Sequence, residues 1–142
     1  MAVIQLSVFL TNQPGEFQKA LDHVSATGAA VRAMSIAEAS AFGILRLIVT
    51  RPEEVRASLL EDQFLVKRNH MVAVQMDDHA EALRPILRLL SEAGMNIEYM
   101  YSFTGTTALS SYVALRVKDY KAVEEILQRN GIKVLNDEDI QL

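Results

Sequence analysis

The feature that most restricts the fold of this chain is an internal repeat. Apolar residues with the spacing of one helix face occur at positions 17, 20, 21 and 24, and again at 83, 86, 87 and 90. Each predicted helix is followed by a glycine, Gly28 and Gly94, and the offset is again 66 positions. Later in the chain the offset becomes 68, and residues 45, 47, 49, 55 and 59 match 113, 115, 117, 123 and 127. The chain is therefore predicted to be a tandem duplication.

Each copy has the same predicted order of elements: strand, helix, strand, strand, helix, strand. We expect strands at residues 3–10, 31–37, 42–49 and 64–67, and then at 71–76, 97–103, 110–117 and 132–135. Thr50 and Asp119 are the expected N-caps of the second helix in each copy. This order predicts an α+β fold of two ferredoxin-like βαββαβ units, each with an antiparallel sheet and helices on one face. The predicted domains span residues 1–68 and 69–142.

Composition and charge exclude several classes of function. The chain has no Cys, which excludes disulfide scaffolds, thiolate metal sites and thiol nucleophiles and fits a reducing compartment. It has no apolar segment of membrane-spanning length and no basic residue ahead of its first apolar residues, so we expect a cytoplasmic protein. With 14 Lys and Arg against 18 Asp and Glu, it lacks the positive charge of a nucleic-acid binder.

Sequence signals for catalysis are also missing. There is no glycine-rich phosphate loop, no HExxH motif and no Gly-x-Ser-x-Gly elbow. The three histidines do not cluster in the sequence, and His23 is expected on the solvent side of its helix. We therefore expect no enzyme, no cofactor and no metal site.

Two short motifs stand at corresponding places of the duplicated fold. Residues 10–17, Leu-Thr-Asn-Gln-Pro-Gly-Glu-Phe, lead from the first strand into the first helix. Residues 94–97, Gly-Met-Asn-Ile, open the second strand of the second copy. Together with the tandem βαββαβ order, these motifs resemble the ACT domain family over nearly the whole chain. The resemblance implies a regulatory module that binds a free amino acid between two such domains.

The chemistry of the first motif agrees with an amino-acid ligand. The exposed N–H groups at a helix start bind a carboxylate, and the helix dipole favours the negative charge. Gly15 allows a ligand to approach the backbone closely, and the carboxamide of Asn12 both donates and accepts hydrogen bonds. The same residues are also typical of an ordinary turn before a helix, and the sequence leaves this alternative open.

The resemblance also implies a composite pocket. In ACT pairs similar to the serine-sensing region of phosphoglycerate dehydrogenase, one domain supplies the turn and the other supplies the asparagine. Here the first copy keeps the turn but has Ala30 at the asparagine position, while the second keeps Asn96 but has Asp77 and Asp78 in place of the turn. We therefore expect one amino-acid site per chain and one degenerate site. The expected ligand-binding residues are Asn12, Gln13, Pro14, Gly15, Glu16, Phe17, Met34, Ser35, Asn96, Ile97 and Met100.

Two functions remain open from the sequence. The first is a stand-alone sensor whose ligand shifts the population of domain arrangements. The second is a regulatory subunit of an amino-acid biosynthetic enzyme, similar to the small subunit of acetolactate synthase, which acts mainly through contact with its partner enzyme. A homodimer is the expected assembly, because ACT domains commonly extend their sheets or pair their helices.

Overall fold

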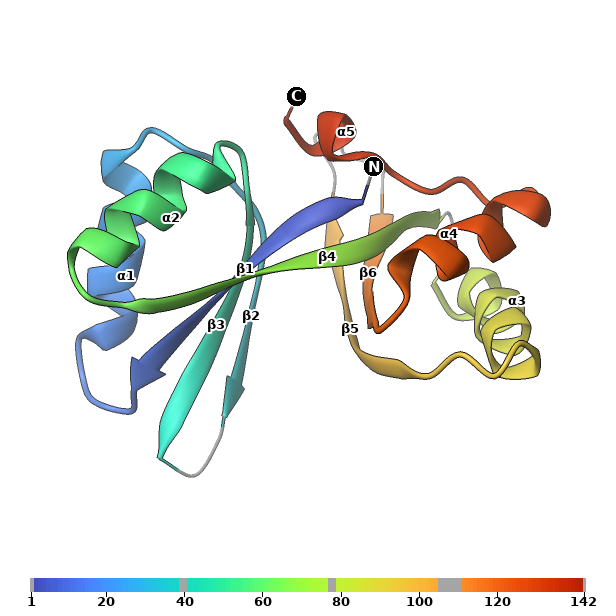
Figure 1. The fold of residues 1–142 in the computed structure, drawn as a ribbon, viewed down its shortest axis with the longest axis horizontal. Coiled ribbons are helices and arrows are strands. Elements are labelled where there is room, and N and C mark those ends of the chain that lie inside the picture. Colours follow the sequence, from blue (N-terminus) through green and yellow to red (C-terminus); the bar gives the residue numbers. More distant parts are fainter. Residues whose placement is uncertain (1, 39–40, 77–78, 105–110, 142) are drawn as a thin grey trace. The chain divides into compact units, whose positions relative to one another are not determined.

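The computed structural model describes residues 2–38, 41–76, 79–104 and 111–141 (Figure 1). The elements are β1 (Val3–Thr11), α1 (Glu16–Ala26), β2 (Val31–Glu38), β3 (Phe42–Val49), α2 (Pro52–Glu61), β4 (Leu65–Met76), α3 (His79–Glu92), β5 (Ile97–Thr104), β6 (Ser111–Val117), α4 (Tyr120–Arg129) and α5 (Asp137–Gln141). The βαββαβ order therefore occurs twice, as predicted. None of the described helices combines the length and the apolar character that crossing a membrane requires.

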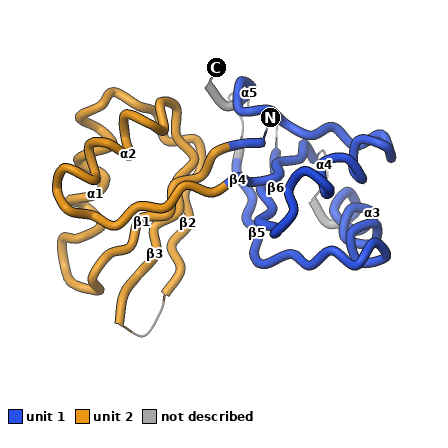
Figure 2. Tube along the Cα trace, in the orientation of Figure 1, with its two compact units in different colours: residues 1–3, 70–140, 142 blue, residues 4–69, 141 orange. Residues whose placement is uncertain are grey.

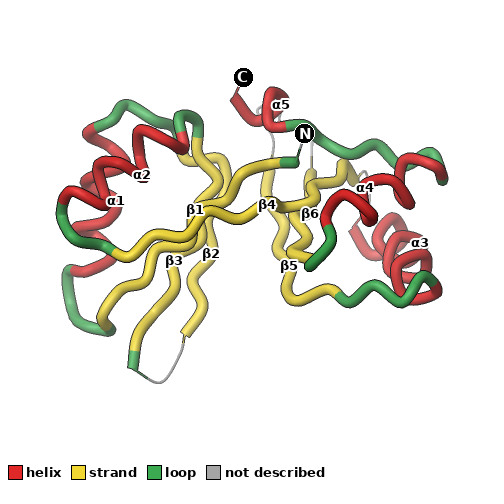
Figure 3. The backbone as a smooth tube through the Cα atoms, viewed as in Figure 1, coloured by secondary structure: helices red, strands yellow, loops and turns green. Residues whose placement is uncertain are grey.

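The chain divides into two compact units (Figure 2). Residues 4–69 form what we call the N-terminal unit, and residues 70–140 form the C-terminal unit, to which residues 2–3 also belong. The strand order is β2-β3-β1-β4-β6-β5, and the pairs β1–β3, β2–β3, β4–β6 and β5–β6 are antiparallel. In each unit the two long helices, α1 and α2 or α3 and α4, cover one face of the strands (Figure 3). This arrangement confirms the predicted α+β sandwich.

The two cores repeat each other at corresponding positions. In the N-terminal unit, Leu6 of β1 pairs with Leu47 of β3, and in the C-terminal unit the equivalent Val72 of β4 pairs with Leu115 of β6. The helices contribute in the same way to both cores. The matched buried residues are Leu6, Val8, Leu10, Ala20, Val24, Leu45, Leu47, Val49, Val55 and Leu59 in one core, and Val72, Val74, Met76, Ile86, Leu90, Val113, Leu115, Val117, Val123 and Leu127 in the other.

The strand between the two copies differs from the prediction. Instead of two short strands separated by a linker near residues 67–70, β4 is one strand of 12 residues. The segment contains no Gly and no Pro, so every residue keeps its N–H and the extended conformation continues without interruption. The last predicted strand, residues 132–135, is reduced to an isolated bridge between Val74 and Val134.

One of the two expected helix caps is confirmed and the other is wrong. Asp119 Oδ1 accepts a hydrogen bond from the N–H of Ala122 at 3.1 Å, as an N-cap does. The N-cap of α2 is Arg51 rather than Thr50, and no side chain caps this helix. Thr50 Oγ1 instead accepts the N–H of Ala30 at 2.8 Å, just ahead of β2. The hydroxyl of Thr50, which the sequence pattern assigned to the helix cap, is therefore used by a residue 20 positions away.

Candidate functional site

The candidate site in the N-terminal unit is the turn that joins β1 to α1. The N–H of Gln13 donates to Thr11 O at 2.9 Å, and the N–H of Glu16 donates to Gln13 O at 3.3 Å. Asn12, Gln13 and Pro14 are exposed. The turn is thus held by its own backbone, and its side chains are available to a ligand.

Gly15 gives this turn its shape and leaves an open space beside it. Its φ of 87° lies in the left-handed region, and a Cβ added there would meet no atom within 4 Å. Gly15 is the N-cap of α1, and no side chain caps the helix. Within the described part of the chain, neither Phe17 nor Gln18 donates its N–H to a protein acceptor. The helix start therefore offers two free donors, which suit a carboxylate.

Phe17 packs against the core of its unit and against β3. A Cβ added at Gly43 would lie 3.1 Å from Cζ of Phe17, so the ring occupies the space that a side chain at position 43 would need. Gly43 pairs with Leu10, near the end of β1. Sequence reasoning missed Gly43, although a glycine inside an apolar strand is a signal that another group approaches the backbone closely.

The predicted residues of β2 lie on opposite faces of the strand. Met34 pairs with the core residue Leu47, so its side chain is on the helix-covered face, yet it is 56% exposed. Ser35 pairs with Arg46 and lies on the other face. Ile36, which the predicted set left out, shares the face of Met34, pairs with Leu45 closer to the turn, and is 59% exposed.

The remaining predicted residues belong to the C-terminal unit. Asn96 is exposed just before β5 and, with Glu98 and Lys118, lines a hollow of about 310 Å³. Ile97 packs against the core of its unit. Met100 is 43% exposed and lines a separate, mostly apolar hollow of about 270 Å³ beside α3. The hollow at Asn96 carries a cation, two acids and a carboxamide, and therefore has partners for both charges of an amino acid.

The predicted degenerate site is only partly visible. Asp77 and Asp78 lie outside the described residues. Ala30 is exposed. Its N–H donates to Thr50 Oγ1 at 2.8 Å, and its C=O accepts the N–H of Thr50 at 2.9 Å. Its backbone groups are therefore used to hold β2 in place.

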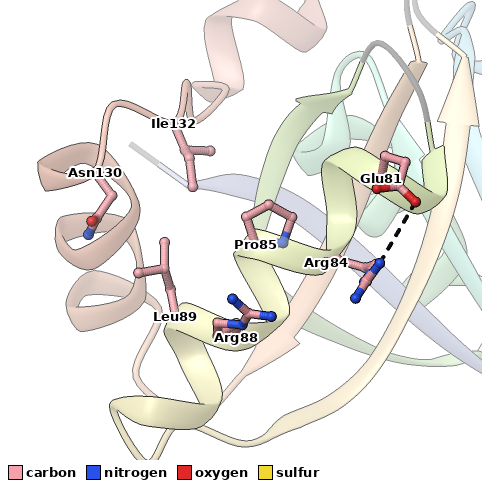
Figure 4. A pocket seen from close by; sticks show the side chains of 7 residues that line it. All are labelled: Glu81, Arg84, Pro85, Arg88, Leu89, Asn130 and Ile132. Carbon is pink, nitrogen blue, oxygen red and sulfur yellow. Dashed lines mark ion pairs between the residues drawn. The ribbon is translucent and has the colours of Figure 1, made fainter.

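A further hollow, of about 490 Å³, lies between α3 and α4 of the C-terminal unit (Figure 4). Pro85 and Leu89 of α3 face Ile132 across it, and two arginines stand on the α3 side. Arg84 forms an i,i+3 ion pair with Glu81 at 3.9 Å. The apolar floor and charged rim of this hollow are those of an ordinary groove between two helices. None of the predicted site residues lines the hollow.

His23 lies in a cluster that joins α1 to α2, which corrects the expectation of a solvent-facing residue. Its side chain is 25% exposed, Nδ1 lies 2.8 Å from Ser58 Oγ, and Nε2 lies 2.9 Å from Asp62 Oδ2. The hydrogen bond from His23 lowers the pKa of the Asp62 carboxyl, and the nearby Lys19 acts in the same direction. Although these residue types match a hydrolytic triad, Ser58 lies within α2, where the helix uses the N–H groups that an oxyanion would need. The cluster therefore clamps two helices together.

Among the described residues of the C-terminal unit, Glu124 is a further carboxyl with a perturbed pKa. Burial raises the pKa of Glu124, while nearby positive charge, His70 included, opposes the shift. The His70 ring stacks on Tyr120 with ring centroids 4.6 Å apart. Among the described residues, no group of three or more His, Cys, Asp and Glu side chains is placed to hold a metal ion.

Comparisons with known proteins identify the family and the fold of the chain. The family model described as "ACT domain pair" matches residues 1–142. The crystal structure of protein BT0572 from Bacteroides thetaiotaomicron is 30% identical, with a TM-score of 0.90 over 99% of this chain and 96% of that chain. The ligand-free regulatory subunit of aspartate kinase from Thermus thermophilus is 14% identical, with a TM-score of 0.64 over 91% of this chain and 93% of that chain. No curated protein sequence matches the chain.

Proposed function

Because this chain belongs to the ACT domain pair family, we propose that it binds a free amino acid at the turn between β1 and α1 and has a regulatory role. The observation that carries the proposal is the uncapped start of α1. The N–H groups of Phe17 and Gln18 have no protein acceptor among the described residues, and the space beside Gly15 is open. The fold is also that of the regulatory subunit of aspartate kinase from Thermus thermophilus, which supports a regulatory role.

Each part of an amino acid has a suitable partner at this turn. The ligand carboxylate accepts the N–H groups of Phe17 and Gln18, where the helix dipole adds favourable energy of about 0.3–1 kcal/mol. The exposed carboxamide of Asn12 accepts from the ammonium, and the carboxylate of Glu16, in the first turn of α1, attracts it. Met34 and Ile36 supply exposed apolar surface on the helix-covered face of the unit.

The contribution of Asn96 is a separate part of the proposal. The resemblance to ACT pairs implies that Asn96 and Asn12 share one composite pocket, and this pairing stays a prediction. If both side chains bind one ligand, Asn12→Ala and Asn96→Ala each weaken binding. If the turn of the N-terminal unit binds alone, only Asn12→Ala does so.

A thermal-shift screen against the twenty amino acids, followed by calorimetry on the variants, tests the proposal. A ligand at 100 times its dissociation constant stabilises the fold by about 2.7 kcal/mol, which raises the melting temperature by several degrees. Loss of the Asn12 hydrogen bond to a charged group is expected to raise the dissociation constant by roughly tenfold or more. Asn130→Ala, at the end of α4, is the matched control. An amino acid that binds Asn12→Ala and the unmodified chain equally well would rule out the turn.

The alternative function is that of a regulatory subunit of an amino-acid biosynthetic enzyme in the cytoplasm. It is supported by the likeness to aspartokinase alpha and beta subunits, with 17% identity and a TM-score of 0.59 over 89% of this chain and 90% of that chain. Tagged protein from a native lysate should then copurify with an amino-acid biosynthetic enzyme whose activity changes when the chain is added. Purification without such an enzyme would favour the stand-alone sensor.

A further inference from the structure

The hollow between α3 and α4 has a filled counterpart in the N-terminal unit. The two copies are matched by an offset of 66 positions in the first helix of each copy and of 68 positions from the third strand onward. With these offsets, four residues that line the hollow correspond to the cluster around His23. The matched pairs are Lys19 and Pro85, His23 and Leu89, Asp62 and Asn130, and Phe64 and Ile132. Two chemically different sets of side chains therefore occupy the same place in the two units.

In the N-terminal unit the four side chains of this place bind one another. Asp62 Oδ2 lies 2.9 Å from Nε2 of His23 and 3.6 Å from Nζ of Lys19. The rings of His23 and Phe64 meet edge to face with their centroids 5.9 Å apart, and Nζ of Lys19 lies 5.6 Å from the centroid of the Phe64 ring. The polar groups of the cluster thus have partners within it, and the space between α1 and α2 is occupied.

In the C-terminal unit the corresponding side chains leave the place open. Pro85 and Leu89 carry no polar side-chain group, and Asn130 Nδ2 turns back to its own helix and donates to Ile126 O at 2.8 Å. The result is the hollow of about 490 Å³, whose floor consists of Pro85, Leu89 and Ile132 (Figure 4). Without the cluster, an apolar floor stays accessible between the two helices.

The charge at the edge of the hollow also differs between the two copies. Arg84 and Arg88 lie one helical turn apart on α3, where the matched residues of α1 are Gln18 and Asp22. Arg84 is weakly paired, because Glu81 lies 3.9 Å away and both side chains are largely exposed. Within the described part of the chain, no acid pairs with the guanidinium of Arg88. This edge therefore attracts an anion, although the whole chain has a net charge of −4.

We propose that the hollow between α3 and α4 binds a small organic anion with an apolar body. The apolar body covers Leu89 and Ile132, and the guanidinium groups of Arg84 and Arg88 hold a carboxylate or phosphate group. Pockets for small ligands have volumes of roughly 300–1,000 Å³ and combine a mostly apolar lining with a few charged groups that fix the orientation of the ligand. A free amino acid suits this hollow less well, because both arginines repel its ammonium group. The site is thus separate from the turn before α1 and takes a second class of ligand.

Calorimetry on the full chain with octanoate tests the class of ligand, because octanoate carries one carboxylate on an apolar chain. We expect octanoate or octyl phosphate to bind, and the tighter of the two identifies the preferred anionic group. Octylammonium and 1-octanol have the same apolar chain without the negative charge, and we expect them to bind about tenfold more weakly or less. Absence of binding by both anions, or equal binding of octanoate and octylammonium, would overturn the proposal.

Substitution of the arginines tests their role in binding the anion. Arg84→Gln and Arg88→Gln are each expected to weaken the binding of octanoate several-fold, and the double variant about tenfold or more. Lys121→Gln removes the same charge from an exposed position of α4 that does not line the hollow, and is the matched control. A loss of affinity in Lys121→Gln as large as in the arginine variants would show that only the net charge matters.

Transfer of a side-chain pair from the N-terminal unit tests the location. Leu89→His combined with Asn130→Asp places at the hollow the two residue types that meet at 2.9 Å in the matched cluster. We expect this double variant to fold, because the same pair already occurs at this place of the fold, and to lose octanoate binding although both arginines remain. The melting temperature shows whether the variant is folded. Unchanged octanoate affinity in the folded variant would rule out the hollow, and the arginine variants provide the test if it does not fold.

Light scattering distinguishes a small ligand from a second copy of the chain as the occupant of the hollow. We expect the mass of the protein in solution to stay the same when octanoate is added, because the hollow is open before the anion binds. A fall in mass on addition of octanoate would show that another copy covers the hollow, and would overturn the proposal.

Discussion

Replacing Gly15 with alanine measures how much stability the turn before α1 gains from a residue that adopts a left-handed backbone conformation. The φ of 87° is left-handed, and an added Cβ meets nothing within 4 Å, so the substitution strains the backbone without a steric clash. An L-residue in this region costs about 1–2 kcal/mol, and the reduced freedom of the unfolded chain offsets about 0.4–1 kcal/mol of this. We therefore expect the free energy of unfolding to fall by about 1 kcal/mol, and the melting temperature by about 3 °C.

Urea denaturation of Gly15→Ala beside Gly131→Ala gives the assay. Gly131 has a φ of 74° and also no neighbour within 4 Å of an added Cβ, so both variants should lose similar stability. They should differ in their response to the amino acid, because only the methyl group at position 15 occupies the proposed binding space. Equal stabilisation of both variants by the ligand would refute the binding role of the turn. Unchanged stability of both would refute the backbone argument.

Three further predictions concern stability. Asp119→Ala removes the cap of α4 and should lower the free energy of unfolding by about 1 kcal/mol in urea titrations. Since the bond from His23 lowers the pKa of Asp62 in the folded state, the ionised carboxylate stabilises the fold above about pH 4, and this contribution is lost as pH falls through the lowered pKa. The stability difference between the unmodified chain and Asp62→Asn should therefore shrink as the pH falls below the ordinary pKa of an aspartate and through the lowered pKa of Asp62. Leu59→Ala, in the core, should cost about 2–5 kcal/mol, and Leu60→Ala, 42% exposed on the same helix, less than about 1 kcal/mol.

Each of these predictions has a result that would contradict it. Asp119→Asn keeps a capping oxygen, so a loss as large as that of Asp119→Ala would mean that the cap is not the cause. A difference for Asp62→Asn that is constant with pH would show that the carboxylate charge does not contribute. Equal losses for Leu59→Ala and Leu60→Ala would mean that burial in the core does not determine the effect.

The sequence by itself determined the duplicated architecture. Apolar residues such as Leu6 and Val72 occupy matched positions because the periodicity of helices and strands decides which side chains can face a core. The turn at residues 12–15 and the cap at Asp119 were also visible, since both depend on neighbours within a few positions along the chain. The tertiary structure adds that α1 is uncapped and that the space beside Gly15 is open.

Only the tertiary structure decided the features whose partners are distant in sequence. Thr50 binds the N–H of Ala30 rather than capping α2, and His23 meets Ser58 and Asp62 across two helices. The ring of Phe17 approaches Gly43, which is likewise distant from it in the sequence. When a polar side chain can bond either to a neighbour in the sequence or to a distant residue, the packing of the whole unit decides which partner it binds. The periodicity of the sequence does not show which of the two partners is chosen.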